Sequence, residues 1–362
     1  MKVLLSGGGT AGHINPALAA AGHLSREHGA EILFVGTKKG LESKLIPDAG
    51  YDIRYIEVSG LIRRLTLKNL LVIKQFVTAV LHAKKIIKAW QPDVVIGTGG
   101  YVCAPVLFAA HALHVPTVIH EQNVIPGVTV KMAASIVDAI CISFPETTKY
   151  LKPALHDKCV LTGNPIREEL LLAQKEAARA SLGLDARPFV VAFGGSLGAQ
   201  ALNNAIVDLV NTGAADDYQL LFGTGQRYFE TVSEQIRKND TAIRLLPYIK
   251  QMDVVMAAAD VVIGRSGALT VSELCALGKP AILIPSPNVA HDHQTYNAKS
   301  MEDAGAALLI RECDLNAQRL KQALSTILGS PETATQMSEK AKAIGITDGA
   351  GRISQVAVSL IK

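Results

Sequence analysis

The sequence KVLLSGGGTAGH, residues 2–13, decides the fold of this chain. Its apolar run at residues 3–6 predicts a buried strand, and the glycines that follow predict a tight turn into a helix. A second stretch, FVVAFGGSLGAQ, repeats the arrangement 187 residues later, at residues 189–200. Each stretch is typical of the opening strand-to-helix turn of a doubly wound sheet. The chain is therefore predicted to contain two similar halves.

Short apolar runs alternate with longer helical stretches in both halves. This alternation predicts βαβ units, parallel sheets and helices on both faces of each sheet, so the fold class is α/β. The sequence GNP at residues 163–165 is typical of a turn between the two halves. We therefore place the domain boundary there and predict domains at 1–164 and 165–345. The predicted strands are 3–6, 32–35, 93–97, 117–120 and 140–143, then 189–193, 219–222, 261–264 and 281–285.

Length and composition exclude several classes of protein. A chain of 362 residues with 49% apolar and 19% charged residues can bury two ordinary cores, which argues against intrinsic disorder. The five cysteines are scattered and never form a CxxC pair, which indicates reduced thiols in the cytosol. Residues 94–120 carry no charge, but glycines and prolines interrupt them, so we expect no transmembrane span. We also expect no signal peptide.

Charge is unevenly distributed between the halves. Residues 1–164 hold 17 basic and 11 acidic residues, whereas the remainder holds 19 and 21. Residues 58–92 contain seven basic residues and no carboxylate. A core helix explains much of the apolar stretch 70–90, but its basic rim also suits attachment to anionic lipid headgroups. The candidate membrane contacts are Phe76, Lys84, Lys85 and Lys88. Nucleic-acid binding is disfavoured, since aromatic residues total 5% and do not interleave with the basic ones.

The two glycine turns can each bind an anion through backbone amides at a helix start. The first turn also fits a tight connection without a ligand, and Ser196 in the second fits an ordinary N-cap. A nicotinamide dehydrogenase is disfavoured, because VGTK at residues 35–38 stands where an acidic ribose contact is needed.

RSGALTVSE at residues 265–273 follows an apolar strand and begins a helix. Its first amides can hold a pyrophosphate, while Glu273, one turn after Thr270, can accept hydrogen bonds from ribose hydroxyls. The alternative is an acidic residue that complements the helix dipole.

Polar residues after the strands of the first half are candidates for acid/base chemistry. Tyr101, His120 and Glu121, together with His13, could each supply an acid/base group, although each could be structural. No cluster of further Cys, His or Glu residues accompanies His291 and His293, and the chain contains no Asp-x-Asp pair. We therefore expect no metal site.

Taken in order, these motifs resemble the bacterial MurG-type UDP-N-acetylglucosamine transferases. Ala11 is a departure, because some members carry glycine there. The matching segments span nearly the whole chain: GGGTAGHINPALA (7–19), GTGGYVCAP (97–105), HEQN (120–123), GNPIR (163–167), GGSLGAQALN (194–203), RSGALTVSE (265–273) and HQTYNA (293–298).

The resemblance implies a GT-B fold of two Rossmann-like domains facing across a cleft, with residues 346–362 as a terminal helix returning to the first domain. It implies an inverting transfer of N-acetylglucosamine from UDP to the C4 hydroxyl of undecaprenyl-pyrophosphoryl-N-acetylmuramyl-pentapeptide. This step serves peptidoglycan synthesis, and through it cell shape and division. The implied donor contacts are Thr10, Ala11, Gly12, Asn123, Arg167, Ser196, Ile249, Ala268, Leu269, Thr270, Glu273 and Gln294. The acceptor hydroxyl needs a base, for which His13 is the candidate, and Tyr101, His120 and Glu121 are candidates for the acceptor side.

The resemblance also implies partners and a location. The partners are UDP-N-acetylglucosamine as co-substrate, the lipid-linked acceptor, inner-leaflet anionic lipids and other cell-wall synthesis proteins, with no cofactor. The location is the cytoplasmic side of the inner membrane, as a peripheral protein. Three rivals stay open: a glycolipid synthase that uses diacylglycerol, a UDP-sugar 2-epimerase, and a sugar-nucleotide-binding subunit without activity of its own.

Overall fold

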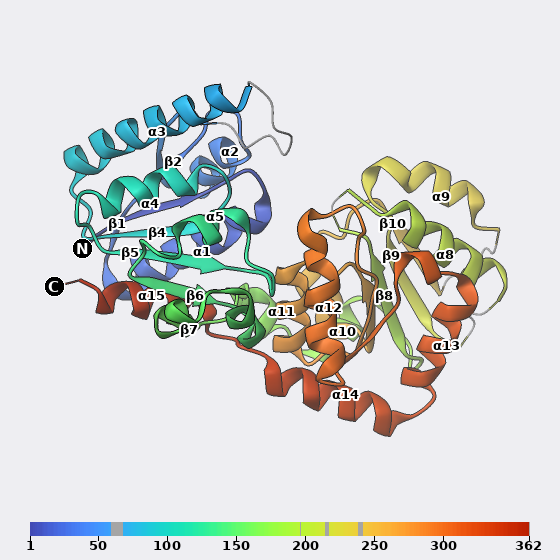
Figure 1. Cartoon of the computed structure of the whole chain (residues 1–362). Helices are drawn as coiled ribbons and strands as arrows, with labels where there is room; N and C mark the ends of the chain where they lie inside the picture. The colour runs from blue at the N-terminus through green and yellow to red at the C-terminus, as the bar shows by residue number, and fades with distance from the viewer. Residues whose placement is uncertain (59–67, 196, 214–216, 238–241, 362) are drawn as a thin grey trace. The chain divides into compact units, whose positions relative to one another are not determined.

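The computed structural model contains two compact units, each built on one parallel sheet (Figure 1). Unit 1 comprises Met1–Pro165 and Asp348–Lys362, and unit 2 comprises Ile166–Thr347. The structure describes residues 1–58, 68–195, 197–213, 217–237 and 242–361, with the backbone alone at 68–73. The predicted α/β class with two parallel sheets is confirmed.

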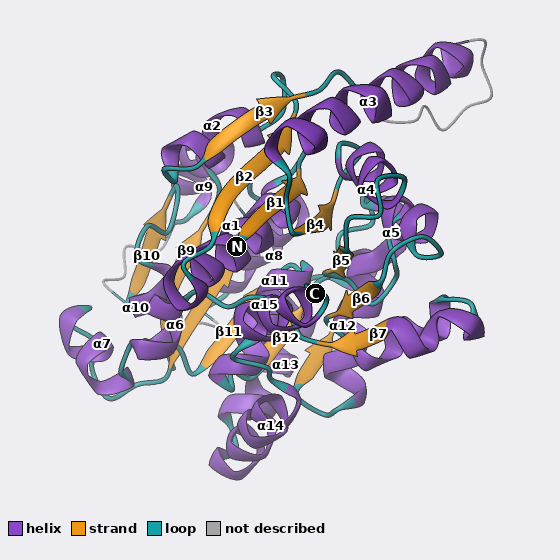
Figure 2. Cartoon of the chain, turned by 90° about the vertical axis from the view of Figure 1, so that its left-hand side faces the viewer, coloured by secondary structure: helices purple, strands orange, loops and turns teal. Residues whose placement is uncertain are grey.

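The sheet of unit 1 has the strand order β3-β2-β1-β4-β5-β6-β7, and all its neighbours are parallel (Figure 2). The order reverses beside β1, which places the turn after β1 at the ligand-binding edge of such sheets. The strands are β1 (Lys2–Gly7), β2 (Glu31–Gly36), β3 (Asp52–Tyr55), β4 (Val94–Gly99), β5 (Thr117–Glu121), β6 (Ala139–Ile142) and β7 (Cys159–Leu161).

The sheet of unit 2 has the corresponding order, β10-β9-β8-β11-β12-β13, again with parallel neighbours. Its order reverses beside β8, so the second glycine turn occupies the equivalent place. The strands are β8 (Phe189–Phe193), β9 (Gln219–Gly223), β10 (Ile243–Leu246), β11 (Val261–Gly264), β12 (Ala281–Leu283) and β13 (Ala307–Leu309).

Four strands, β3, β7, β10 and β13, are not predicted from the sequence, and these are the edge strands of the two sheets. Burial explains the omission. β1 and β4 are almost wholly buried, whereas three of the four residues of β3 are exposed and all four residues of β10 are half-buried. An edge strand has one neighbour and less cover from helices, so it lacks the continuous apolar run that reveals a central strand.

Helices cover both faces of the unit 1 sheet. Alternate residues of β1 point to opposite faces, so Leu4 packs with α3 and α4 while Val3 and Leu5 pack with α1 and α15. Helix α15, from the far end of the chain, packs on α1 through Ile353 and Ala357. The helices are α1 (Ala11–His28), α2 (Glu42–Asp48), α3 (Lys68–Trp90), α4 (Cys103–His111), α5 (Val128–Ala133) and α15 (Gly349–Ser359).

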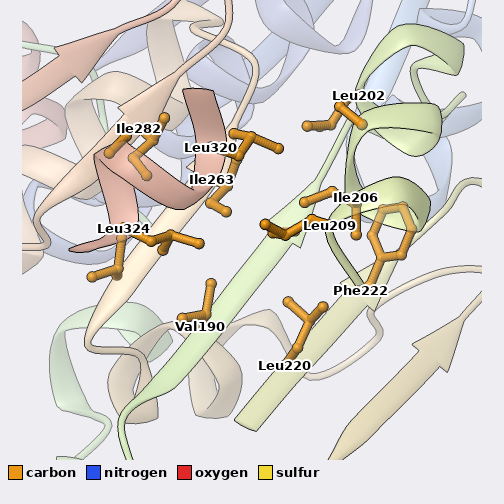
Figure 3. Close-up of a cluster of buried hydrophobic side chains, with 14 of the residues drawn as sticks. Val190, Leu202, Ile206, Leu209, Leu220, Phe222, Ile263, Ile282, Leu320 and Leu324 are labelled. Carbon is orange, nitrogen blue, oxygen red and sulfur yellow. The ribbon is translucent and has the colours of Figure 1, made fainter. Parts of the chain in front are cut away.

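The core of unit 2 lies between its sheet and the amphipathic helices α8 and α13 (Figure 3). Leu202, Ile206 and Leu209 of α8 face the strands, as do Leu320 and Leu324 of α13. The helices are α6 (Glu168–Leu172), α7 (Lys175–Ser181), α8 (Gln200–Asn211), α9 (Phe229–Gln235), α10 (Met252–Ala258), α11 (Ala268–Leu277), α12 (His293–Asp303), α13 (Ala317–Leu328) and α14 (Pro331–Ile344).

Candidate active site

In unit 2, the carboxyl ends of β8, β11 and β12 border a cavity of about 760 Å³. Three loops form its walls: the glycine turn after β8, the turn after β11, and the segment between β12 and α12. This edge of a parallel sheet is where ligands bind in doubly wound folds. Its lining includes Gly195, Gly198, Gly267, Thr270, Ser286 and Gln294.

Helix α11 begins at this cavity. Its N-cap, Gly267, has an extended backbone, and both Gly267 and Thr270 line the cavity. The amides of the first turn have no acceptor inside the helix, and the helix dipole adds partial positive charge there. The start of α11 can therefore hold an anion such as a phosphate.

Glu273, one turn along α11 from Thr270, pairs with Arg167, the N-cap residue of α6. The Nε and Nη2 atoms of Arg167 both donate to Glu273 Oε1, each at 3.3 Å, which leaves Oε2 able to accept other hydrogen bonds. Burial raises the pKa of Glu273, and the Arg167 guanidinium opposes that rise. A carboxylate in this setting suits a diol, since two hydroxyl groups can donate to it.

A smaller cavity of about 150 Å³ shares Phe193, Gly195 and Thr270 with the larger one. Its walls bring together four of the predicted donor contacts, Arg167, Ile249, Thr270 and Glu273. The buried Ile249 and the exposed Tyr248 supply an apolar side, together with Met252 and Met256. A flat heterocycle fits such a wall, because it can pack there while its polar edge reaches backbone groups.

Gln294 is held in place by its own side chain and backbone. Its Oε1 accepts a hydrogen bond from Ser286 N at 2.9 Å, and its carbonyl oxygen accepts one from Ser266 Oγ at 2.8 Å. The side-chain amide nitrogen is therefore the group that remains for a ligand in the larger cavity. Among the other predicted donor contacts of unit 2, Ala268 is buried, Leu269 is half-buried, and Ser196 lies outside the described residues.

In unit 1, His13 lies in the first turn of α1, beside the glycine turn that follows β1. Its Nδ1 is 3.2 Å from the carbonyl oxygen of Gly8 and 3.3 Å from Thr10 Oγ1. A carbonyl oxygen can only accept, so it favours the tautomer with the proton on Nδ1. That tautomer leaves Nε2 unprotonated, as a general base requires. Thr10 and Ala11 are exposed beside it, and Gly12 is half-buried.

Glu42, at the start of α2, is a buried carboxylate that the sequence analysis does not single out. It accepts hydrogen bonds from Gly9 N at 3.0 Å and from Thr37 N and Oγ1 at 3.0 and 2.7 Å. Three glycines leave room for it, because a Cβ on Gly8, Gly36 or Gly40 would collide with its side chain. Burial acts to raise the pKa of Glu42, but these hydrogen bonds outweigh it and hold the pKa below the ordinary range.

Two candidates for the acceptor side, His120 and Glu121, are buried at the end of β5. His120 is fully buried, and its ring nitrogens lie within hydrogen-bond distance of Ser143 Oγ, the Gly163 carbonyl and Gln122 Nε2. Burial lowers the pKa of His120 to about 4. Glu121 accepts hydrogen bonds from the backbone N–H groups of Asn123 and Gly127, and burial raises its pKa. Both side chains therefore shape the loop that carries Asn123.

Tyr101, after β4, is the candidate for the acceptor side that borders a cavity. Its hydroxyl lies 3.4 Å from Thr37 Oγ1, and its ring lies against Gly9. All the residues that line this cavity, of about 670 Å³, belong to unit 1.

Two family models match this chain and together cover most of it. The glycosyltransferase family 28 N-terminal domain matches residues 3–142, and the glycosyltransferase family 28 C-terminal domain matches residues 189–353. The chain belongs to glycosyltransferase family 28.

Curated relatives of this family 28 chain share its full length. A protein of Acetivibrio thermocellus is 45% identical over 100% of this chain and 99% of its own. A protein of Lactiplantibacillus plantarum is 43% identical over 100% of both. Both are named UDP-N-acetylglucosamine–N-acetylmuramyl-(pentapeptide) pyrophosphoryl-undecaprenol N-acetylglucosamine transferase. The resemblance to the MurG-type transferases is thereby confirmed.

Solved structures agree with the family 28 assignment. MurG of Acinetobacter baumannii superimposes with a TM-score of 0.80 at 28% identity, covering 99% of each chain. A UDP-GlcNAc 2-epimerase of Neisseria meningitidis gives a TM-score of 0.71 at 12% identity over 99% of this chain and 100% of its own, and it shares the fold alone.

Helix α3 of this family 28 chain carries the predicted membrane contacts. Its residues Ala79, Ala83 and Ile87 are buried, whereas Lys85 and Lys88 are exposed and Lys84 is half-buried. The half-buried Phe76 packs edge to face on Phe108, with ring centroids 5.6 Å apart. Val77 and Leu81 of the same helix are not among the predicted membrane contacts, and each is more than half exposed.

The residues that the structure describes contain no group of three or more His, Cys, Asp or Glu side chains placed to hold a metal ion. In the same residues, no helix is sufficiently long and apolar to cross a membrane.

Proposed function

We propose that this chain transfers N-acetylglucosamine from UDP-N-acetylglucosamine to the C4 hydroxyl of undecaprenyl-pyrophosphoryl-N-acetylmuramyl-pentapeptide, with inversion at the anomeric carbon. Its family makes it a glycosyltransferase, and the names of its full-length relatives state this donor and this acceptor. The observation that carries the proposal is the Arg167–Glu273 pair, which lines the smaller cavity; this cavity shares Thr270, in the first turn of α11, with the larger one.

The donor nucleotide occupies unit 2. The uracil packs beside Ile249, and the ribose hydroxyls donate to Glu273 Oε2. The pyrophosphate lies against the first-turn amides of α11, at Ala268, Leu269 and Thr270, and against the turn that contains Ser196. Gln294 donates through its side-chain amide to the sugar. Thr10, Ala11, Gly12 and Asn123 are further proposed donor contacts, from unit 1.

Departure of UDP is assisted by positive charge that is fixed before the reaction. As the bond between the anomeric carbon and the phosphate oxygen breaks, negative charge builds on the pyrophosphate. The amides at the start of α11 and the guanidinium of Arg167 stabilise that charge without reorienting. These groups supply the stabilisation from the chain itself, and we propose UDP-N-acetylglucosamine as a co-substrate with no bound cofactor.

His13 accepts the proton of the acceptor hydroxyl as that oxygen attacks the anomeric carbon. The Gly8 carbonyl orients the ring through Nδ1, so Nε2 presents its lone pair. Tyr101 lies on the acceptor side, and the buried His120 and Glu121 contribute to that side by shaping the loop that carries Asn123. The α3 surface around Lys84, Lys85 and Lys88 attaches the protein to anionic lipid at the cytoplasmic face of the membrane, where the acceptor and other cell-wall synthesis proteins are placed.

The test combines purified protein with UDP-N-acetylglucosamine and a short-chain lipid-linked muramyl pentapeptide in EDTA, and it follows UDP release. The proposal expects release that depends on the acceptor and yields a β-linked disaccharide lipid. Consumption of the donor without any acceptor would indicate a 2-epimerase, and transfer to diacylglycerol alone would indicate a glycolipid synthase. Donor binding without release, even after magnesium is restored, would indicate a subunit that needs a catalytic partner.

A further inference from the structure

None of the proposed donor contacts lines the cavity of about 670 Å³ in unit 1. It lies where β2, β3 and β4 end, and α3 closes one side of it. Its volume is in the range of small-molecule sites. Its polar lining includes Thr37, Lys38, Lys39, Glu57, Gln75, His82 and Tyr101.

The lining of this cavity favours an anion. Lys38 and Lys39 follow Thr37 in the turn after β2 and are both exposed, and the lining contains one carboxylate, that of Glu57. Gln75 and His82 of α3 add side chains that can donate hydrogen bonds, and Thr37 and Tyr101 add hydroxyl groups. Ammonium groups beside neutral donors are a common setting for phosphate oxygens.

One wall of the cavity is shared with the loop that carries the candidate base. A Cβ on Gly9 would lie 3.3 Å from Tyr101 Cε1, so the tyrosine ring covers the glycine turn. The carbonyl of the preceding Gly8 holds His13 Nδ1. Tyr101 thus contacts both the anion-favouring cavity and the glycine turn that holds His13.

Helix α3, the proposed membrane-facing helix, also contributes to the lining. Gln75 and His82 line the cavity and are exposed, and Val77, Leu81 and Lys85 of the same helix are exposed as well. The cavity is therefore bordered by Tyr101, which contacts the glycine turn that holds His13, and by the helix that carries the candidate lipid surface. In the proposed acceptor, the pyrophosphate links the reacting sugar to the lipid.

We infer that this cavity binds the pyrophosphate of the lipid-linked acceptor, with Lys38 and Lys39 as its principal cations. The inference rests on the proposed function, because it takes the acceptor from there. Lys38 and Lys39 set acceptor affinity, and they contribute nothing to donor affinity.

The experiment measures steady-state transfer by Lys38→Ala/Lys39→Ala in neutral detergent with a short-chain acceptor. The matched control is Lys44→Ala/Lys149→Ala, which removes two exposed lysines of unit 1 that line none of the cavities described. We expect the acceptor KM of the cavity variant to rise about tenfold or more, with the donor KM unchanged. The control should behave as wild type.

A second acceptor, with a neutral linker in place of the pyrophosphate, identifies the group that is recognised. The cavity variant and wild type should use this acceptor equally poorly, because the group that the lysines contact is absent. An unchanged acceptor KM for the natural pyrophosphoryl substrate would overturn the inference, as would an equal loss with both acceptors.

Binding to vesicles that contain anionic lipid distinguishes the acceptor pyrophosphate from lipid headgroups. The cavity variant should bind such vesicles as wild type does; weaker vesicle binding with an unchanged acceptor KM would assign the lysines to headgroups and overturn the inference. Failure of wild type to release UDP with the acceptor would instead contradict the proposed function itself.

Discussion

Glu42 Oε2 accepts a hydrogen bond from Gly9 N at 3.0 Å, so a carboxylate of the chain itself occupies part of the glycine turn of unit 1. The similar turn of unit 2 lines an open cavity through Gly195 and Gly198. The two turns have similar sequences but different partners. In unit 1 the turn positions His13, and in unit 2 it is available to a phosphate.

Glu42→Gln is expected to destabilise unit 1 by about 1–3 kcal/mol at neutral pH, because the amide cannot accept all the hydrogen bonds that the carboxylate accepts. The pKa of Glu42 lies below that of a glutamate in the unfolded chain. Its charge therefore stabilises the fold above the unfolded pKa, and that contribution is lost as the pH falls through the folded pKa. Urea denaturation at several pH values measures this. The deficit of the variant should shrink in acid, and a deficit independent of pH would contradict the assignment. Glu31→Gln, at an exposed position of β2, is the control.

Glu273→Gln is expected to raise the KM for UDP-N-acetylglucosamine by about ten- to a hundredfold, since the charged acceptor of the ribose hydroxyls is lost. The elevated pKa of Glu273 adds a pH dependence. Donor affinity of wild type should begin to fall at a higher pH than for an ordinary glutamate, and the variant should not show this fall. Calorimetry of UDP binding at several pH values measures both the loss of affinity and its pH dependence. The variant Glu176→Gln, at an exposed position, is the control. Equal UDP affinity in variant and wild type would exclude the ribose contact.

The variants His13→Ala and His13→Asn distinguish the role of His13 as a general base from its hydrogen bond to the Gly8 carbonyl. The asparagine amide can still donate to the Gly8 carbonyl in place of Nδ1, but it supplies no equivalent of Nε2. Both variants should therefore lose about 10²–10⁴-fold in turnover while UDP binding persists. If His13→Asn retains wild-type turnover, the ring serves only to hold the loop.

Replacing Lys84, Lys85 and Lys88 by glutamate is expected to weaken binding to anionic vesicles, because each lysine near such a surface contributes about 1 kcal/mol. Co-sedimentation with vesicles measures this, and transfer to a short-chain acceptor in detergent should be unchanged. The control replaces three exposed lysines of unit 2, Lys299, Lys321 and Lys340, by glutamate. Equal vesicle binding by both triple variants and wild type would mean that α3 is only a structural helix.

Ile353→Ala is expected to destabilise unit 1 by about 2–5 kcal/mol, because Ile353 of α15 is fully buried against α1. Gln355→Ala, at an exposed position of the same helix, should cost little. Thermal unfolding of the two variants compares them directly. Similar melting temperatures would show that α15 does not stabilise unit 1.

The sequence by itself determined the fold class and the central strands. Residues such as Val3–Leu5 and Val190–Val191 are buried on both sides of a sheet, so their apolar runs are continuous and visible along the chain. The glycine turns and the start of α11 were visible for a similar reason, since each follows such a strand directly. The family could be predicted because these motifs occur in a fixed order.

Only the tertiary structure decided the edge strands and the partners of the polar groups. β3 and β10 pair through backbone hydrogen bonds, which leave little trace in side-chain pattern. Glu42 reaches Gly9 across 33 residues, and Arg167 reaches Glu273 across 106. Such contacts form only when residues that are distant in the sequence come together in the folded chain. The tertiary structure also distinguishes two histidines: His120 is fully buried, whereas Nδ1 of His13 lies within hydrogen-bond distance of a carbonyl oxygen. The spacing of residues along the sequence predicts neither environment.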